Sequence, residues 1–554
     1  MKILLTKKGI ILTVIVIFVA ANIVPSIGGN NGMIKNVSEN IRGQVSFLGD
    51  PSEEEWNQTF DGPGDDRGKC VIQTTDGGYI CLCDKIDKIG DNRLNSDIWL
   101  IKTDAYGYEQ WNRTYGGSNF DLGSQVQQTQ DGGYIVLGTI QLGSDSGDFW
   151  LIKTDSIGSV QWSRIFGGPG GDSGESVLQV SDGGYIIAGQ KYVSPETTWD
   201  TWLIKTNETG VEEWNHTYGG YHIDGSYEVQ ETLDGGYILC GCTCSFVEPS
   251  TLWDPYDAWL IKTNSEGVEQ WNHSFGTNRS YEWGFSVQQL PDGGFIVAGL
   301  VLGDGKHDGL LIRTDESGVE IWNRSYGEIY PGIVTFFCIN LTYDGDFIIC
   351  GGNGYFDPQK GNLYDIWVLK TDCSGDILWE KKYGEREYID IGYSIAQTAY
   401  GGYIITGRIE TKDLEGSAAI LIKLSPENQA PDAPTITGPT NGRAGTSYTY
   451  TFTSTDPDGD DVSYYIKWGD EDITDWTSFQ ASGPPGYEES HIWNEQDTYI
   501  IESKAKDVNG LESDWSYLKI TMPKNKMMLH NPFWYRLLER FPNMFPILKY
   551  LLKI

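Results

Sequence analysis

The sequence is poor in histidine and in basic residues. Its 554 residues include 6 His, and 40 Lys and Arg stand against 77 Asp and Glu, for a formal net charge of −37. The histidines show neither a metal-ligand nor a catalytic-triad spacing. The acid excess argues against nucleic acid as a partner, because a phosphate backbone is bound by Lys and Arg. It suits a saline or calcium-rich exterior, although it also simply keeps a protein soluble.

Helical periodicity is lacking between residues 53 and 425, where a strand-patterned unit of about 50 residues repeats instead. Each copy reads as four short strands with a tight glycine turn between the first two. That turn is DGGY at Asp76, Asp131, Asp182 and Asp234, DGGF at Asp292, DGDF at Asp344 and YGGY at Tyr400. Seven strand-only repeats predict an all-β fold, a seven-bladed β-propeller with one blade per repeat.

The count of strand fragments predicts how the ring closes. A Trp-led fourth strand occurs at Trp56, Trp111, Trp162, Trp214, Trp271, Trp322 and Trp379. The first of these precedes any first strand, and the last repeat stops after its third strand near Leu424. We therefore expect Trp56 to Phe60 to supply the outer strand of the last blade, close to Ile420, which closes the propeller and leaves no free edge. The repeated Trp residues are expected to pack between blades.

The two ends of the chain predict export. Residues 1–26 carry Lys2, Lys7 and Lys8 before an apolar run, as in a signal peptide or N-terminal anchor. Residues 27–52 read as a linker, 53–425 as the propeller, 426–523 as an immunoglobulin-like β-sandwich after a Pro-rich start, and 524–554 as an amphipathic tail. The tail is too short and too interrupted to span a bilayer. It is either an interfacial anchor or a helix docked on the sandwich, so we expect a secreted or cell-surface protein that meets the membrane surface through its termini.

Loops that differ from blade to blade are expected to carry function, whereas the uniform turns on the opposite face are scaffold. These loops are rich in aromatic residues, which bind sugar rings or protein surfaces, or else pack the loops together. The candidate ligand-binding residues are Trp199, Tyr221, Trp253, Tyr256, Trp283, Tyr330 and Tyr355.

An acid shortly before each inner strand is nearly constant, with Tyr330 in its place in the sixth repeat. The acids are Asp66, Asp121, Asp172, Asp224, Glu282 and Asp390. They could ring the channel mouth and attract a cation or a basic partner. The alternative is that each caps its own turn through backbone N–H groups. A Lys or Arg recurs in every third strand, which a repeated ion pair explains better than catalysis.

Cysteines and sequons offer further candidate sites. Most of the nine Cys sit inside predicted strands, as small core residues do. Folding the first hairpin about Asp76 and Gly77 places Cys70 opposite Cys83, which would allow a disulfide there. Five sequons directly follow the fourth-strand Trp, at Asn57, Asn112, Asn215, Asn272 and Asn323. They predict glycosylation around the rim, unless Asn and Thr are simply good polar residues for an edge strand.

The sandwich segment resembles polycystic-kidney-disease-type (PKD-type) and related immunoglobulin-like modules of secreted prokaryotic proteins. The resemblance rests on Asp456–Asp460, on Tyr465–Asp470 and on Asp507–Gly510. It implies a spacer or a domain that contacts carbohydrate or protein. A dense set of carboxylates there could hold calcium, although Asp-Pro-Asp-Gly is also ordinary turn chemistry. The set is Asp456, Asp458, Asp460 and Asp461.

The repeats resemble two groups of propellers. The Asp104…Gly107…Trp111 element is similar to the Trp-docking repeat of quinoprotein propellers, with one residue fewer before the Gly. The DGGYIVLG hairpin followed by WLIKTDxxG resembles the delta-type repeats of secreted prokaryotic seven-bladed propellers. This implies an architecture and little about activity. We expect an exported binding or adhesion protein that recognises glycan or protein without catalysis or a required cofactor; the alternative is a glycan hydrolase or lyase that uses loop carboxylates.

Overall fold

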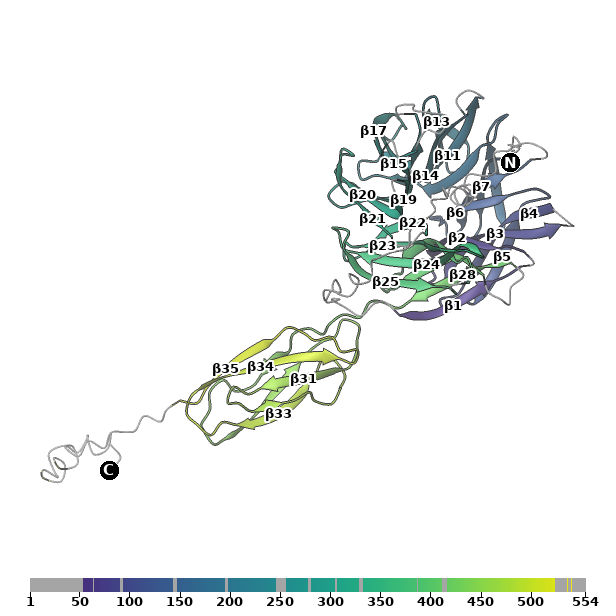
Figure 1. Ribbon diagram of the computed structural model, residues 1–554. Helices are drawn as coiled ribbons and strands as arrows, with labels where there is room; N and C mark the ends of the chain where they lie inside the picture. Colours follow the sequence, from purple (N-terminus) through teal and green to yellow (C-terminus); the bar gives the residue numbers. More distant parts are fainter. Residues whose placement is uncertain are drawn as a thin grey trace, which may run out of the picture. The chain divides into compact units, whose positions relative to one another are not determined.

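A computed structural model describes residues 53–62, 64–89, 93–142, 147–194, 198–245, 256–277, 280–303, 306–327, 332–385, 387–410, 416–523, 536 and 540. The described chain is all-β (Figure 1) and divides into two compact units, Met1–Glu427 and Asn428–Ile554. None of the described residues forms a helix that is long and apolar enough to cross a membrane. The predicted signal segment, the 27–52 linker and almost all of the 524–554 tail lie outside the described residues.

The first unit consists of seven four-stranded antiparallel sheets, six of them built from consecutive strands. The first sheet holds β2 (Arg67–Gln73), β3 (Tyr79–Ile89), β4 (Arg93–Thr103) and β5 (Glu109–Tyr115). The second holds β6 (Leu122–Gln128), β7 (Tyr134–Ile140), β8 (Asp148–Thr154) and β9 (Val160–Phe166). The third holds β10 (Ser173–Gln179), β11 (Tyr185–Ser194), β12 (Thr198–Thr206) and β13 (Glu212–Tyr218). The fourth holds β14 (Asp224–Glu231), β15 (Tyr237–Thr243), β16 (Asp257–Thr263) and β17 (Glu269–Phe275).

The remaining sheets follow the same plan until the last one. The fifth holds β18 (Ser280–Gln289), β19 (Phe295–Gly303), β20 (Lys306–Thr314) and β21 (Glu320–Tyr326). The sixth holds β22 (Val334–Leu341), β23 (Phe347–Asp357), β24 (Gly361–Thr371) and β25 (Ile377–Tyr383). The seventh holds β26 (Ile391–Gln397), β27 (Tyr403–Glu410), β28 (Ser417–Leu424) and, at its outer edge, β1 (Glu54–Phe60). In every sheet the strands stand in the order in which the repeat was expected to supply them.

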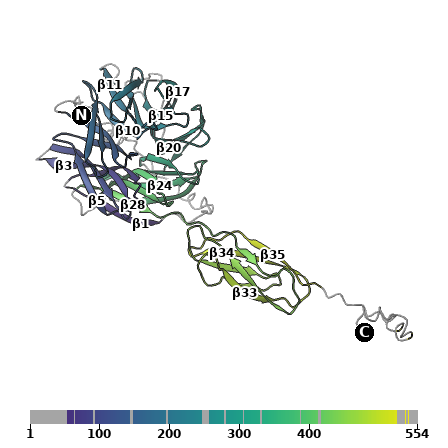
Figure 2. The same cartoon turned by 180° about the vertical axis from the view of Figure 1, so that it is seen from behind.

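The seam between the two ends of the unit confirms the predicted strand pairing. β1 runs antiparallel to β28, with Asn57 opposite Ile422 and Thr59 opposite Ile420. Figures 1 and 2 show purple β1 beside green β28, although more than 350 residues separate them in the chain. A buried sheet edge would leave backbone donors and acceptors without partners, and β1 satisfies those of β28.

The DGG turns form because Gly supplies backbone conformations that other residues resist. In the second sheet Thr129 N donates to Gly133 O at 2.9 Å, while Gly132 has φ +80°. Asp131 Oδ1 accepts from Gly133 N at 3.0 Å and from the Thr129 hydroxyl at 2.6 Å. A Cβ on Gly133 would lie 2.2 Å from Thr154 O, so a larger residue would require the backbone to shift, as it must at Asp346 of the sixth turn.

The fourth-strand Trp of one sheet packs against the following sheet, as expected. The Trp162 ring on β9 lies 5.8 Å from the Tyr185 ring of the third sheet, edge to face. It also covers Gly210 in the β12–β13 turn, where a Cβ would lie 2.4 Å from the indole. The same arrangement joins Trp111 to Tyr134 and Gly158. A side chain at either glycine would overlap the Trp of the preceding sheet, which explains why glycine occupies this turn.

A glutamine at the end of each of several inner strands ties neighbouring sheets together. Gln128 Oε1 accepts from Thr75 N in the turn of the preceding sheet at 2.9 Å. Gln73 Oε1 accepts from Ala399 N of the seventh sheet at 2.8 Å, so the first sheet is joined to the last in the same way. The core between these two sheets is also continuous, because Val71, Cys81 and Trp99 pack with Ile404 and Leu421.

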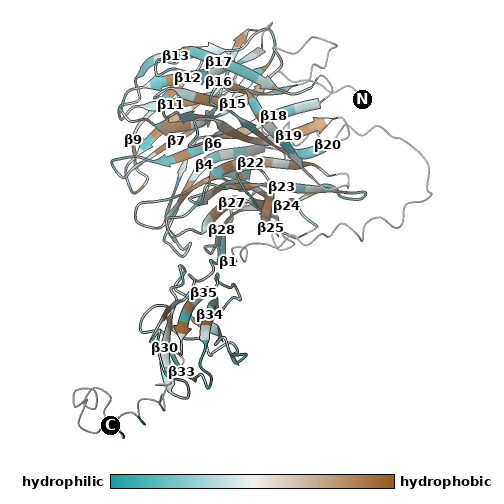
Figure 3. Cartoon of the chain, turned by 90° about the vertical axis from the view of Figure 1, so that its left-hand side faces the viewer, coloured by the Kyte–Doolittle hydropathy of each residue, from teal (hydrophilic) through white to brown (hydrophobic). Residues whose placement is uncertain are grey.

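The second unit has two sheets over one core, as the predicted sandwich requires. One sheet holds β29 (Thr435–Thr437), β30 (Ser447–Thr453) and β33 (Tyr487–Ile492). The other holds β32 (Ile473–Thr474), β31 (Val462–Lys467), β34 (Thr498–Asp507) and β35 (Ser516–Thr521). Tyr450, Phe452, Tyr464, Trp468 and Trp493 are buried between them. Figure 3 shows apolar residues along the strands, while outer strands of the first unit such as β13 are largely hydrophilic.

The disulfide expected between Cys70 and Cys83 is wrong. The first hairpin turns over Thr74 to Gly78, so Cys70 lies opposite Leu82 and Cys83 lies opposite Gly68. A one-residue change of register moves a side chain to the other face of the sheet. Cys70 accordingly packs with Ile80 and Leu82, whereas Cys83 packs in the core toward the seventh sheet. Cys70 and Cys83 are free thiols, and so are the directly opposed Cys338 and Cys350.

Candidate binding surfaces

The acids that precede the inner strands are buried and bind backbone groups, so the channel-mouth interpretation is corrected. Asp121 accepts from Gly117 N through Oδ2 and from Gln141 N through Oδ1, both at 2.9 Å. Asp390 joins Glu385 N at 3.0 Å to Glu410 N at 2.8 Å in the same way. All six have exposed fractions of 6% or less: Asp66, Asp121, Asp172, Asp224, Glu282 and Asp390. Each such aspartate links the loop before its inner strand to the end of the second strand. These carboxylates therefore cap their own turns, as the alternative proposed, and also hold a second segment in place.

A second acid from the preceding sheet lies beside several of these carboxylates. Burial and, to a smaller extent, the charge of Asp148 raise the pKa of Asp172 to about 6. Burial likewise raises the pKa of Asp390 to about 7, with added repulsion from Asp365. Asp97 and Asp200 approach the acid of the next sheet in the same manner. Because the pair recurs from sheet to sheet, it belongs to the scaffold and does not single out one catalytic centre.

Three of the predicted ligand-binding aromatics, Trp199, Tyr256 and Trp283, pack the loops together. Trp199 Nε1 donates to Gly171 O at 2.7 Å, and Trp283 is buried and stacks on Tyr256 with ring centroids 5.4 Å apart. Tyr355 is half-buried, whereas Tyr221 is 81% exposed. Trp253 and Tyr330 lie outside the described residues. Among the described members of the set, Tyr221 is therefore the one that offers a fully accessible ring.

An aromatic arc that the sequence did not reveal crosses four inner strands. Tyr227 lies 5.0 Å from Phe285, Phe285 lies 5.4 Å from Phe337, and Phe337 lies 5.0 Å from Tyr393. Lys69 Nζ continues the arc, 5.2 Å from the Tyr393 ring. Each of these residues is the extra residue of a β-bulge, directly before the position where register resumes. Side chains of a regular strand point alternately to the two faces of the sheet, and a bulge residue departs from this alternation. The alternating sequence pattern of the strands therefore did not predict that these rings lie together.

The third-strand Lys residues form the predicted ion pairs. Lys153 Nζ lies 2.8 Å from Asp131 Oδ2 in the DGG turn of its own sheet and also donates to Thr154 O at 2.8 Å. Equivalent pairs involve Lys102 with Asp76, Lys205 with Asp182, Lys262 with Asp234, Arg313 with Asp292 and Lys370 with Asp344. The buried amines hold the hairpin turns and are not available for catalysis.

The five sequon asparagines have a structural role. Asn112 Oδ1 accepts from Trp99 Nε1 at 3.2 Å, while its Nδ2 donates to Glu109 Oε1 at 2.6 Å. The bond from Nδ2 to a Glu three residues earlier recurs at Asn57, Asn215, Asn272 and Asn323. These contacts explain the Glu-x-x-Asn spacing without a glycan, and glycosylation stays a prediction.

The aspartates considered for calcium make separate contacts. Asp456 Oδ1 accepts from Asp458 N at 2.9 Å and from Asp460 N at 3.2 Å, which is turn capping. Asp458 accepts from Gln429 N, and Asp460 Oδ2 accepts from Asn509 Nδ2 at 2.8 Å. Asp461 is exposed. The calcium site stays a prediction, and the turn alternative accounts for the contacts of Asp456.

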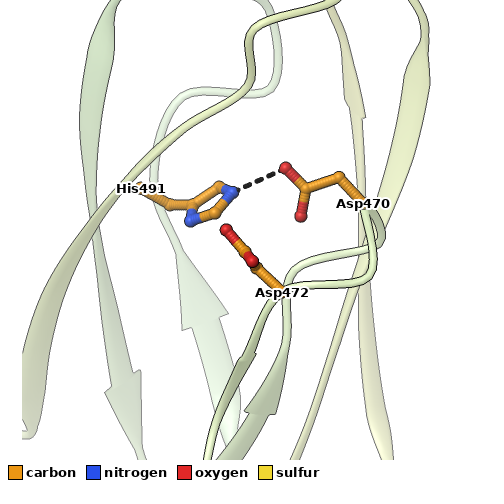
Figure 4. Close-up of side chains that lie close together, drawn as sticks. All are labelled: Asp470, Asp472 and His491. Carbon is orange, nitrogen blue, oxygen red and sulfur yellow. Dashed lines mark hydrogen bonds and ion pairs between the residues drawn. The ribbon is translucent and has the colours of Figure 1, made fainter.

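A different group in this unit brings three metal-ligand side chains together. Asp470, Asp472 and His491 each offer a ligand atom, and these atoms lie within 4.8 Å of one another. Figure 4 shows His491 directed at Asp470, with Asp472 beside them; the His491 Nε2 to Asp470 Oδ2 distance is 2.8 Å. The 21 residues between Asp470 and His491 carry no spacing that predicts this contact, because it forms through the packing of one sheet on the other.

The outer face of the β31–β34–β35 sheet carries aromatics interleaved with lysines. We call it the aromatic–lysine face: Tyr465, Lys467, Trp476, Lys504, Lys506 and Trp515. Its ring centroids lie 5.6 Å apart for Tyr465 and Trp476 and 6.0 Å apart for Tyr465 and Trp515. Lys506 Nζ lies 4.1 Å from the Trp476 ring, and Lys467 Nζ lies 4.2 Å from the Trp515 ring. Residues 428–523 hold 17 acidic and 5 basic residues, and three of those five are on this face.

Comparison with known proteins finds similarity in one part of the chain. No family model matches the chain, and no curated protein matches it. The PKD domain of an M14-like peptidase from Thermoplasmatales archaeon SCGC AB-540-F20 is 48% identical over 99% of its length. The match covers 18% of this chain, about the size of the two-sheet unit, at a TM-score of 0.17. The chain contains a PKD domain. The PKD1 domain of Vibrio anguillarum Epp also matches, at 21% identity over 99% of its length, 17% of this chain and a TM-score of 0.13.

Proposed function

We propose that the seven sheets of the first unit are the blades of a closed seven-bladed β-propeller of the delta-type and quinoprotein-like kind. Three contacts between the two ends of the unit support this proposal. β1 completes the seventh sheet, Gln73 of the first sheet holds a turn of the seventh, and one apolar core joins the two sheets. The inner strand β2 also contacts both β6 and β26, as neighbours on either side in a ring would.

The protein that carries this scaffold is, in our proposal, an exported cell-surface binding or adhesion protein that recognises glycan or protein and does not act on it. The aromatic–lysine face of the PKD domain is the observation that carries the proposal. Aromatic rings stack on sugar rings, and ammonium groups between them bind carboxylate or sulfate groups. The variable loops of the propeller, with exposed Tyr221, supply a second contact surface.

A glycan hydrolase or lyase is the alternative, and the raised pKa values of Asp172 and Asp390 are what favour it. Burial raises the pKa of both carboxyls into the range of a general acid. Their exposed fractions of 2% and 0%, and their bonds to backbone N–H groups, keep them from a substrate. Binding without turnover therefore fits the described carboxylates better.

A glycan array probed with the full chain, with release of reducing ends measured on every bound glycan, tests this function. We expect binding of acidic glycans without product, and at least about a fivefold loss of binding when Trp476 and Trp515 are both replaced by alanine, since stacking contributes about 0.5–1.5 kcal/mol per ring pair. Tyr400→Ala, an 83% exposed ring in a scaffold turn, is the matched control and should bind normally. Product formation that disappears in Asp390→Asn would establish the enzyme instead.

A further inference from the structure

We propose that Asp470, Asp472 and His491 of the PKD domain form a binding site for one divalent transition-metal ion of the zinc type. The three ligand atoms already lie within 4.8 Å of one another (Figure 4). The site is separate from the carboxylates considered for calcium and from the aromatic–lysine face. It adds a metal function to a domain for which the proposed role is contact with a ligand.

The backbone holds both aspartates on the same side of one short loop. Trp468 N donates to Asp472 O at 3.0 Å, which closes the loop between β31 and β32. Gly469 has φ +84° and Glu471 has φ +76°, and Glu471 is the non-glycine residue with positive φ among the described residues. These two left-handed residues turn the chain so that Asp470 and Asp472 can approach one imidazole.

The imidazole is fixed from two sides by indole rings. His491 stacks on Trp468 with centroids 4.6 Å apart and planes at 8°, and it meets Trp493 edge to face at 4.7 Å. Trp493 Nε1 in turn donates to Trp468 O at 3.0 Å. A ligand ring that cannot rotate loses little conformational entropy when a metal binds.

The charge balance and the donor types favour a zinc-like ion. Two carboxylates face one imidazole, and Asp470 Oδ1 is shielded from solvent and accepts no hydrogen bond. An imidazole nitrogen with carboxylate oxygens suits Zn²⁺, which binds at three protein ligands with a fourth position left to water. Calcium needs six to eight oxygens, more than this group provides. Asp472 is exposed, so an ion can reach the site from solvent.

Metal binding exchanges one hydrogen bond for three coordinate bonds. His491 Nε2 and Asp470 Oδ2, now 2.8 Å apart, would both turn their lone pairs to the ion. The imidazole binds in its neutral form, with its proton on Nδ1 and the Nε2 lone pair on the ion. Asp472 would supply the third ligand from the end of the loop.

Equilibrium dialysis of the full chain against Zn²⁺ tests the site. The wild type should bind one ion more than His491→Gln and Asp472→Asn, or bind that ion at least about tenfold more tightly. Asp475→Asn, an exposed carboxylate three residues after Asp472, is the matched control and should bind like the wild type. Zinc held by cysteine thiols or by the Asp456 region is equal in all four proteins and cancels in the comparison.

Cobalt supplies a second readout that does not depend on stoichiometry. Co²⁺ bound at one nitrogen and two oxygens gives visible absorption bands, which should be present in the wild type and in Asp475→Asn and lost in Asp472→Asn. Asp472 is exposed, so this variant should keep the wild-type circular dichroism spectrum. Equal zinc stoichiometry and affinity in all four proteins, with unchanged cobalt bands, would overturn the proposal. That result would leave glycan or protein binding through the aromatic–lysine face untouched.

Discussion

Gly210→Ala should destabilise the first unit more than Gly183→Ala, although both glycines belong to the third sheet and have similar backbone angles. Gly210 has φ +73° and Gly183 has φ +87°, so both variants carry the cost of a left-handed alanine, about 1–2 kcal/mol. The two sites differ in what surrounds the new methyl group. A Cβ on Gly210 would lie 2.4 Å from the Trp162 ring, whereas a Cβ on Gly183 meets nothing within 4 Å.

The difference between the two variants measures the docking of Trp162. Forcing a methyl group against a packed ring costs about 1–3 kcal/mol. We therefore expect Gly210→Ala to lower the free energy of unfolding by about 2–5 kcal/mol and Gly183→Ala by about 1–2 kcal/mol. Urea unfolding followed by circular dichroism, with equal m-values in both variants, gives the two numbers.

Trp162→Ala provides the internal control. Removing the ring should itself cost about 3–5 kcal/mol, because the indole packs edge to face on Tyr185. In that background Gly210→Ala should cost about as much as Gly183→Ala, since the ring is gone and the remaining neighbour, Arg164 Cγ at 3.0 Å, belongs to a flexible side chain. Equal effects of the two glycine substitutions in the wild-type chain would refute the role of the Trp in joining consecutive sheets.

Three further results are expected. Lys153→Met should lower the free energy of unfolding by about 1.5–3 kcal/mol in thermal or urea unfolding, because it removes charged hydrogen bonds to Asp131 and Thr154 O. Burial raises the pKa of Asp131, but the hydrogen bonds from Lys153 and Thr129 outweigh burial and lower this pKa to about 2. The contribution of the pair to stability is therefore lost as the pH falls through about 2. Asp390 is the opposite case: burial raises its pKa to about 7, so its share of stability should rise as the pH falls from 8 toward 5, and Asp390→Asn should flatten that rise, whereas an unchanged pH profile would contradict it. Dithiothreitol should leave the Tm unchanged because Cys70, Cys83, Cys338 and Cys350 are free thiols, and a drop in Tm would reveal a disulfide.

The repeat pattern predicted the sheets and the seam because both depend on local signals. The DGG turns fix where strands end, and the unpaired fragment at Trp56 could complete only the sheet that lacked a fourth strand. The Lys153–Asp131 pair followed from the same regularity. These features depend on short spacings that recur in each repeat, so they can be recognised in the sequence without the tertiary structure.

Features that depend on a one-residue offset or on tertiary packing escaped prediction. A hairpin centred on Asp76 and a bulge after Gly68 together moved Cys70 away from Cys83. Bulges likewise placed Phe285 and Phe337 in one arc, against the alternation expected of a strand. His491 meets Asp470 only through the packing of two sheets, which no spacing in the sequence reports.

Hydrogen exchange of the β1 amides tests the central claim, that an early strand completes the last sheet and closes the propeller. If β1 pairs with β28 as described, those amides of Glu54–Phe60 that donate to β28 should exchange as slowly as the amides of β28 itself. Mass spectrometry of peptides covering Glu54–Phe60 and Ser417–Leu424 reads both segments in one experiment. Exchange of the β1 peptide within seconds, beside a protected β28, would contradict the account.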